Sequence, residues 1–262
     1  MTAMPDVQFD SGSATHVGLV RAQNEDNFIA RPEIGLWAVA DGMGGYSAGD
    51  LASAMVVETL GALPPPENAA ALLQACQQGM FETNQKIIDA ARDRGLTVIG
   101  TTVVILLVAD RHFACLWAGD SRIYRVRKGA IEQITRDHSE AQELIDRGVL
   151  TPAEAKKWAG RNVITRALGA YDCVDLDQTS GEIEAGDVFV LCSDGLTAHV
   201  EDGEIPFHVA HTKAGLACDE LVRLTLERGA QDNVTVVVVR YKPESDTIVV
   251  PGAISARGQD QQ

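Results

Sequence analysis

Three short apolar runs along the chain each lie next to an aspartate that is followed by glycine or asparagine. The pairs are Leu36–Ala40 with Asp41, 188–192 with Asp194, and 234–239 with Asp232. Short runs rich in valine and leucine and bounded by turn residues are typical of buried strands. The sequence therefore predicts a β-rich core whose carboxylates gather at strand ends.

Further strands are predicted in the middle of the chain. Thr102–Val108 and Phe113–Trp117 are apolar and rich in strand-forming residues, and they flank a polar turn. This pattern predicts an antiparallel hairpin, which Ile123–Val126 continues as a third strand.

Helices are predicted between the strands. Apolar residues recur at helical spacing over 48–63 and stop at three consecutive prolines, and 67–94 supports one helix or a pair. Residues 151–154 combine a threonine cap, a proline and a capping-box glutamate, so a helix is expected to begin there.

Composition limits the partners and the location. A formal net charge of −15 would repel nucleic acid, and the basic stretch 122–128 is interpreted as a solvated strand face rather than a docking patch. The five cysteines lack the spacing of a zinc site, and no secretory signal or membrane span is apparent. We therefore predict a cytoplasmic, monomeric protein with one domain over 1–242 and a flexible tail over 243–262.

Several carboxylates accompany the strands, and their chemistry suggests a metal site. They occur at Glu25 and Asp26, Asp41, Asp120, Asp194 and Asp232. Each alone is more simply explained as a turn residue or helix cap. Together, and without a His or Cys cluster, they suit hard cations such as Mg²⁺ or Mn²⁺, which take oxygen ligands.

Six motifs appear in one order along the chain. They are Arg21-Ala-Gln-Asn-Glu-Asp-Asn27, Asp41-Gly-Met-Gly-Gly45, Gly100-Thr-Thr102, Gly119-Asp-Ser-Arg122, Ser193-Asp-Gly-Leu196 and Asp232-Asn-Val-Thr235. The stretch from Thr15 to Tyr241 in this way resembles the type 2C metal-dependent protein phosphatases of the bacterial type. The resemblance implies an α+β fold in which two antiparallel β-sheets pack as a sandwich flanked by helices on both faces.

The resemblance also implies roles for individual residues. Asp41 would bridge two Mn²⁺ or Mg²⁺ ions, the Gly42 carbonyl would bind one of them, and Asp194 and Asp232 would complete the ligands. Glu25 and Asp26 would act through bound water, Arg21 would bind phosphate, and Asp120 would hold a weak third ion. The implied reaction is hydrolysis of phosphoserine or phosphothreonine in proteins by metal-activated water, opposing a bacterial Ser/Thr kinase.

Two departures from the family pattern concern the general acid and the third ion. Met43 stands where many eukaryotic members carry a histidine proposed as general acid, and Ala198 stands where a carboxylate often binds the third ion. His138 could be nominated as an acid, but a histidine that holds a loop by hydrogen bonds is the favoured interpretation. Residues 140–168 resemble the family's flap, which would lie beside the site and influence substrate choice.

Two other functions compete with this one. Residues 45–49, Gly-Tyr-Ser-Ala-Gly, match the nucleophile elbow of serine hydrolases, and histidines follow at 199, 208 and 211. The elbow requires its strand to run directly into the serine, whereas Asp41 to Gly44 intervene. A catalytically silent relative that only binds phosphoproteins is the second alternative, and the retained aspartates disfavour it.

Overall fold

The computed structural model describes residues 8–44 and 48–242 and consists of two antiparallel β-sheets packed face to face. One sheet is ordered β1 (Gln8–His16), β11 (Val234–Lys242), β10 (Val188–Cys192), β7 (Arg122–Arg127), β8 (Ala130–Gln133). The other is ordered β2 (Asp26–Arg31), β3 (Leu36–Gly44), β5 (Val103–Ala109), β6 (His112–Ala118), β9 (Asp177–Glu182), and β4 (Ile99–Thr101) pairs with β3.

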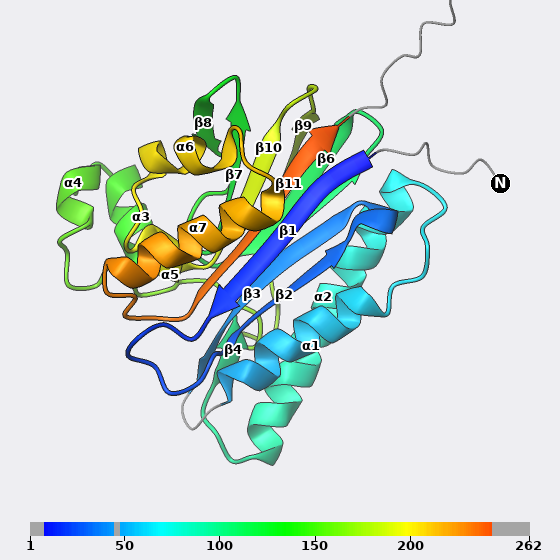
Figure 1. The fold of residues 1–262 in the computed structure, drawn as a ribbon. Helices are drawn as coiled ribbons and strands as arrows, with labels where there is room; N and C mark the ends of the chain where they lie inside the picture. Colours follow the sequence, from blue (N-terminus) through cyan, green and yellow to red (C-terminus); the bar gives the residue numbers. More distant parts are fainter. Residues whose placement is uncertain (1–7, 45–47, 243–262) are drawn as a thin grey trace, which may run out of the picture.

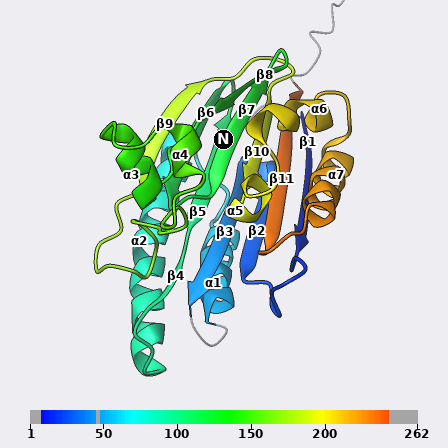
Figure 2. The ribbon, with the colours of Figure 1, turned by 90° about the vertical axis from the view of Figure 1, so that its left-hand side faces the viewer.

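Helices cover the outer face of each sheet (Figures 1 and 2). The long helices α1 (Gly49–Gly61) and α2 (Ala69–Asp93) pack on the β3–β5 sheet, and α7 (Ala214–Glu227) packs on the β1–β11 sheet. The shorter helices are α3 (Glu140–Asp146), α4 (Pro152–Ala155), α5 (Asp194–Thr197) and α6 (Ile205–Val209), with the 3₁₀ turns η1 (Pro32–Ile34) and η2 (Asp202–Glu204). The predicted α-β-β-α sandwich is confirmed.

The layered core explains why the predicted strands read as unbroken apolar runs. Side chains alternate between the two faces of a strand. In β5, Ile105 packs toward α1 and α2, whereas Val104 and Leu106 pack between the sheets. In β11, Val236 faces the α7 side and Val237 faces the other sheet. Both faces of these central strands are buried, so both sets of positions are apolar.

Most predicted elements are present, with three differences. The stretch 67–94 forms one helix, α2, which Asn68 caps by accepting a hydrogen bond from the Ala71 amide. The strand predicted to stop before Asp41 continues to Gly44, because the backbone from Gly42 to Gly44 pairs with β4. The strand β9 was not predicted, because its sequence Asp-Gln-Thr-Ser-Gly-Glu has no apolar side.

The stretch 122–128 is only partly the solvated strand face that was predicted, since Lys128 is exposed but the arginines are partly buried. Arg122 makes a twin hydrogen bond with Asp137, and Arg127 does the same with Asp187. Arg125 pairs with Glu132 across the β7–β8 hairpin. The three arginines form ion pairs with acids of neighbouring segments. The stretch is therefore not a basic patch that is free to bind a partner.

Candidate metal centre

The predicted metal-binding residues come together at one end of the sandwich. Asp41 lies within β3 and is paired with Asp26 of β2 in the antiparallel register. Asp120 lies in the turn after β6, Asp194 begins α5, and Asp232 lies just before β11. All four of the other acids are close enough to act electrostatically on the carboxylate of Asp41. Strands from both sheets therefore deliver their end carboxylates to one place.

Thr102 fixes the backbone at the centre of this cluster. Its amide donates to the Asp41 carbonyl at 2.8 Å, and its hydroxyl accepts from the Asp41 amide at 3.2 Å. The same hydroxyl lies 2.7 Å from the hydroxyl of Ser121, the neighbour of Asp120. The threonine thus links the strand that carries Asp41 to the turn that carries Asp120.

Glycine after each of two aspartates is required by close packing. A Cβ on Gly42 would lie 2.2 Å from the Gly49 carbonyl oxygen, and one on Gly195 would lie 1.9 Å from the Asn233 carbonyl oxygen. The sequence suggested instead that Gly42 lets its carbonyl approach a cation. The structure adds a second reason for glycine: contact with α1 leaves no room for a side chain.

Two buried carboxylates in the cluster are only partly satisfied. The Ser193 hydroxyl donates to Asp26 Oδ2 at 2.8 Å and accepts from the Thr235 amide at 3.0 Å. Asp26 Oδ1 and Asp120 Oδ1 are buried without a hydrogen-bond partner among the described residues. Buried polar atoms in folded proteins nearly always find partners, so these two oxygens call for one.

Burial and mutual repulsion raise the pKa of four acids at the centre, Asp26, Asp41, Asp120 and Asp194. The pKa of Asp26 rises to about 7 and that of Asp120 to about 8, with burial as the main cause. Burial followed by the charge of Asp232 raises the pKa of Asp194 to about 6. Burial followed by the charge of Asp26 raises the pKa of Asp41 well above its ordinary value. Divalent cations would relieve this repulsion.

The residues present fit a hard divalent cation by their chemistry. The candidate donors are carboxylates, of which Asp26 and Asp120 each keep an oxygen without a hydrogen-bond partner, and no thiol or imidazole lies among them. Within the described ranges, however, no group of three or more His, Cys, Asp or Glu side chains is arranged so that it could hold a metal ion. The assignment therefore rests on donor type and burial, and the ligand roles of Asp41, Gly42, Asp194 and Asp232 stay predictions.

Arg21 lies at the exposed edge of the carboxylates. Its Nη2 donates to Asp232 Oδ2 at 2.7 Å, and its side chain is 57% exposed. This hydrogen bond is the main cause of the raised pKa of Arg21. Glu25, four residues on, accepts from the Gly49 amide at 3.3 Å, and burial raises its pKa. A guanidinium at the mouth of an acidic site can bind an incoming phosphate.

His138 holds a loop, as the sequence analysis favoured. Its Nδ1 accepts from the Gly119 amide at 3.1 Å, and its Nε2 lies 3.2 Å from Asp177 Oδ2. The ring also stacks on Trp117, and burial lowers its pKa. The histidine braces the turn that carries Asp120 and is engaged on both nitrogens.

Sequence reasoning missed the polar residues that hold the site together. Thr102, Ser193 and Asn233 appear in the recognised motifs but received no role. Their side chains are buried and bonded to the segments that carry the acids. Buried Thr, Ser and Asn beside a strand end are the signal that could have identified them, since a buried polar group requires a partner.

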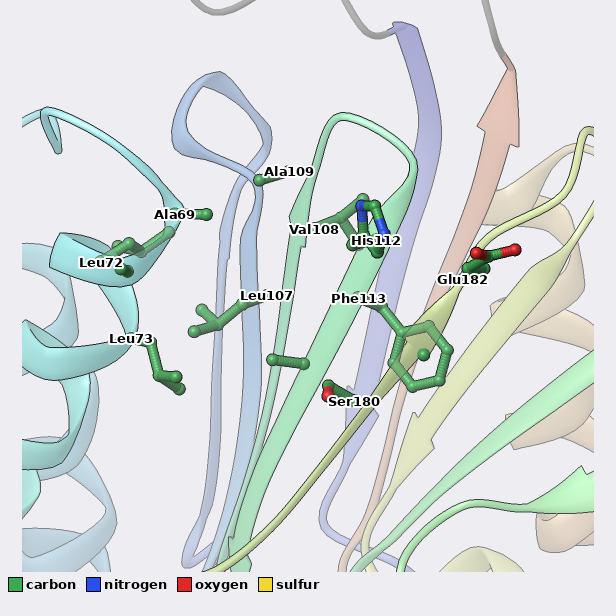
Figure 3. Close-up of a pocket in the computed structure, with 13 residues that line it drawn as sticks. Ala69, Leu72, Leu73, Leu107, Val108, Ala109, His112, Phe113, Ser180 and Glu182 are labelled. Carbon is green, nitrogen blue, oxygen red and sulfur yellow. The ribbon is translucent and has the colours of Figure 1, made fainter.

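An apolar cavity of about 420 Å³ lies away from the carboxylates. It lies between the start of α2 and the turn that joins β5 to β6. Figure 3 shows Leu73 on one side of it and Phe113 on the other. Asp120 follows β6 at the opposite end of that strand. The cavity therefore takes no part in the acidic site.

Comparison with known proteins identifies the family. The family described as Protein phosphatase 2C matches residues 20–220. The chain belongs to this family. PstP of Mycobacterium tuberculosis, a serine/threonine protein phosphatase, is 37% identical over 249 residues, which are 94% of this chain and 48% of that protein. This chain therefore spans about half the length of PstP.

Other relatives match over nearly their whole length. Protein phosphatase PhpP of Streptococcus pneumoniae is 33% identical over 88% of this chain and 96% of its own. The structure of PppA, a regulatory component of the T6SS in Pseudomonas aeruginosa, superposes with a TM-score of 0.84 at 41% identity, covering 90% of this chain and 99% of that one. The PstP catalytic domain in complex with two manganese ions superposes with a TM-score of 0.82 at 36% identity, covering 89% and 98%.

Proposed function

We propose that this member of the protein phosphatase 2C family is a metal-dependent protein serine/threonine phosphatase. The observation that carries the proposal is the cluster of buried, incompletely bonded carboxylates with an arginine at its mouth. Such a cluster is costly to fold and becomes favourable when cations occupy it. Among its relatives, PstP is described as a serine/threonine protein phosphatase and PhpP as a protein phosphatase.

We assign two Mn²⁺ or Mg²⁺ ions to Asp41, Asp194, Asp232 and the Gly42 carbonyl, with Glu25 and Asp26 acting through water. The PstP catalytic domain carries two manganese ions, which supports this pair. When bound, such ions neutralise the charge of a phosphate and lower the pKa of water.

The protein's own groups bind and orient the substrate. Arg21 would donate to two phosphate oxygens with its planar fork, and its Nη2 at present donates to Asp232. Met43 cannot transfer a proton, and both nitrogens of His138 are already engaged. Protonation of the leaving group then falls to water.

We propose that residues 1–242 form the catalytic domain and that the segment 140–168, with α3 and α4, influences substrate choice. This segment is anchored beside the site because the Thr165 amide donates to the carbonyl of His138 and the Leu168 amide donates to that of Thr101. The predicted tail 243–262 lies outside the described residues. Substrates would be phosphoproteins, and a Ser/Thr kinase would be the opposing enzyme.

The cytoplasmic location and the monomeric state stay predictions. Within residues 8–44 and 48–242, the structure contains no helix that is both long and apolar enough to cross a bilayer. The described cysteines are all free thiols, and burial raises the pKa of Cys76 and Cys192 to about 12. Unpaired thiols of this kind accord with a reducing compartment.

Chelation tests the proposed function directly. A phosphothreonine peptide should be dephosphorylated in manganese, this activity should vanish in EDTA, and added manganese should restore it. Activity that survives EDTA, together with labelling by a fluorophosphonate, would favour the serine-hydrolase alternative, whose residues 45–47 lie outside the described part of the chain. A protein that binds the peptide without turnover would be the silent relative.

A further inference from the structure

The loop from residue 17 to residue 25 carries both Arg21 and Glu25 between β1 and β2. Its first half rests on the segment just before β11. The Leu19 amide donates to the Ala230 carbonyl at 2.8 Å, and Gly18, with φ of +81°, passes so close to the Asp232 carbonyl that a Cβ would lie 2.2 Å from its oxygen. The position of this loop is therefore set largely by residues 230–233.

One buried side chain of that segment spans the whole loop. Asn233, which is 6% exposed, donates through Nδ2 to the carbonyls of Val17 and Gln23, each at 2.9 Å. Its Oδ1 accepts from the Glu25 amide at 2.8 Å. The side-chain amide thus makes three hydrogen bonds to the backbone of the loop: at its first residue, Val17, at Gln23, and at its last residue, Glu25.

Arg21 lies between these anchored points but is itself weakly held. Its guanidinium contacts Asp232 and is otherwise largely exposed. An exposed arginine loses conformational freedom when it binds phosphate, and a fixed backbone reduces that loss. The two backbone positions that fix Arg21, Val17 and Gln23, are bonded to the same nitrogen of Asn233.

We propose that Asn233 is a positioning residue that holds the Arg21 loop in the geometry needed to bind phosphate. The inference rests on the phosphate-binding role proposed for Arg21. Asn233 acts through the loop, because its side-chain amide bonds to the backbone of Val17, Gln23 and Glu25. Its neighbour Asp232 is an assigned metal ligand, so one short segment sets both the metal and the phosphate side of the site.

A double-mutant cycle tests the proposal with inorganic phosphate as the probe. Binding of phosphate to the manganese-loaded protein is measured for wild type, Arg21→Ala, Asn233→Ala and the double variant. Each single variant should weaken binding about tenfold, since a charge-assisted hydrogen bond is lost or misplaced. The double variant should be weakened by about the same tenfold, because both changes remove one interaction. A hundredfold loss in the double variant would show independent effects and overturn the proposal.

A second readout needs neither metal nor activity. Amide hydrogen exchange of the metal-free protein should become faster in residues 17–25 of Asn233→Ala and stay unchanged elsewhere. Unchanged exchange in residues 17–25 would show that Asn233 does not hold the loop, and would overturn the proposal. Faster exchange combined with undiminished phosphate binding in both single variants overturns the role of Arg21, and the inference with it. The two failures are therefore distinguishable.

A matched control separates positioning from general destabilisation. Asn68→Ala removes the asparagine cap of α2, far from the loop, with the same chemical change. It should lower the unfolding temperature, leave phosphate binding within twofold of wild type and be additive with Arg21→Ala. If Asn233→Ala does not fold, Asn233→Ser keeps a small polar group but cannot reach all three partners, and the same non-additivity is expected.

Discussion

The two ends of strand β10 each carry a buried or half-buried aspartate, and the two are treated in opposite ways. Asp187, just before the strand, is 1% exposed; both its oxygens accept from Arg127, and one also accepts from the Glu184 amide. Asp194, two residues after the strand, faces other acids, and burial with the charge of Asp232 raises its pKa to about 6. One end of the strand is a finished ion pair, and the other is a concentration of like charge.

The difference separates structural acids from functional ones. A buried carboxylate that serves the fold is surrounded by donors, as Asp187 is, because an unpaired buried charge costs several kcal/mol. Asp26 and Asp120 each keep a buried oxygen without a partner in the described part of the chain. A fold retains such groups when a ligand supplies the missing partner, and sites of this kind are where local rules are broken.

The largest effect should follow from removing charge at the acidic end. Asp41→Asn and Asp232→Asn keep the side-chain shape but lose the charge that holds a cation, so both variants should fold and lose nearly all phosphatase activity. Manganese titration by calorimetry measures the loss of cation binding, and turnover of an aryl phosphate measures the loss of activity. Wild-type binding and turnover in either variant would show that the proposed site is wrong.

Substitutions at the two ends of β10 should change the free energy of unfolding in opposite directions. Arg127→Ala leaves Asp187 buried without its main donor and should cost about 3 kcal/mol of unfolding free energy with phosphatase activity retained. Asp120→Asn removes one of the mutually repelling acids and should stabilise the metal-free protein at pH 8 by roughly 1 kcal/mol. Urea unfolding in the presence of a chelator measures both. Destabilisation by Asp120→Asn would contradict the distinction between the two ends.

The sequence predicted the acids of this comparison better than their surroundings. Asp41, Asp194 and Asp232 were placed at strand ends because each adjoins an apolar run, and both faces of those strands are buried in the layered core. Their roles as metal ligands came from the resemblance to the family. The partners of the arginines were not predicted. Arg127 and Asp187 are sixty residues apart, and single-sequence patterns carry no signal for a contact at that separation.

Polar elements were the other limit of prediction. β9 has no apolar face, so only its pairing with β6 makes it a strand. In the sequence, Asn233 looks like an ordinary turn residue. Its hydrogen-bond partners lie in a loop more than two hundred residues earlier in the chain. Local patterns specify burial and periodicity, whereas these bonds are decided by how distant segments meet.

The pH dependence of stability should differ with and without metal. In the folded metal-free protein the pKa values of Asp194, Asp26 and Asp120 are raised to about 6, about 7 and about 8, above ordinary carboxyl values near 4. Between roughly pH 4 and pH 8 the folded state binds more protons than the unfolded state, so stability falls as pH rises. The unfolding temperature in chelator should be lower at pH 8 than at pH 5, and manganese at pH 8 should restore it.

Asp120→Asn provides the control for that titration. It removes the acid with the highest of the three values, so the decline in unfolding temperature between pH 7 and pH 8 should become shallower. Arg127→Ala, at the other end of β10, should shift the whole curve without changing its slope there. A metal-free protein whose stability rises with pH across this range would contradict the raised pKa values.

The smallest expected effect concerns a third cation at Asp120, where alanine takes the place of a second carboxylate at position 198. Ala198 is exposed at the end of α5, one helical turn after Asp194, and therefore lies on the same side of that helix. His199 is no substitute, because its Nε2 accepts from the Gln231 amide at 3.2 Å and imidazole suits Mn²⁺ or Mg²⁺ poorly. We predict that Asp120 binds a third ion weakly, with water in place of the missing carboxylate.

Activity measured over a range of manganese concentrations tests this third site. Wild type should need more manganese for full activity than for filling the two-ion core, because the last ion has one carboxylate fewer than it could have. Asp120→Ala should lower the maximal activity while calorimetry still detects the core ions. Ala198→Asp should shift the activity curve to lower manganese, since a second carboxylate adds a ligand and compensates charge. Three superimposable curves would remove Asp120 from metal binding and leave its unpaired oxygen without a function.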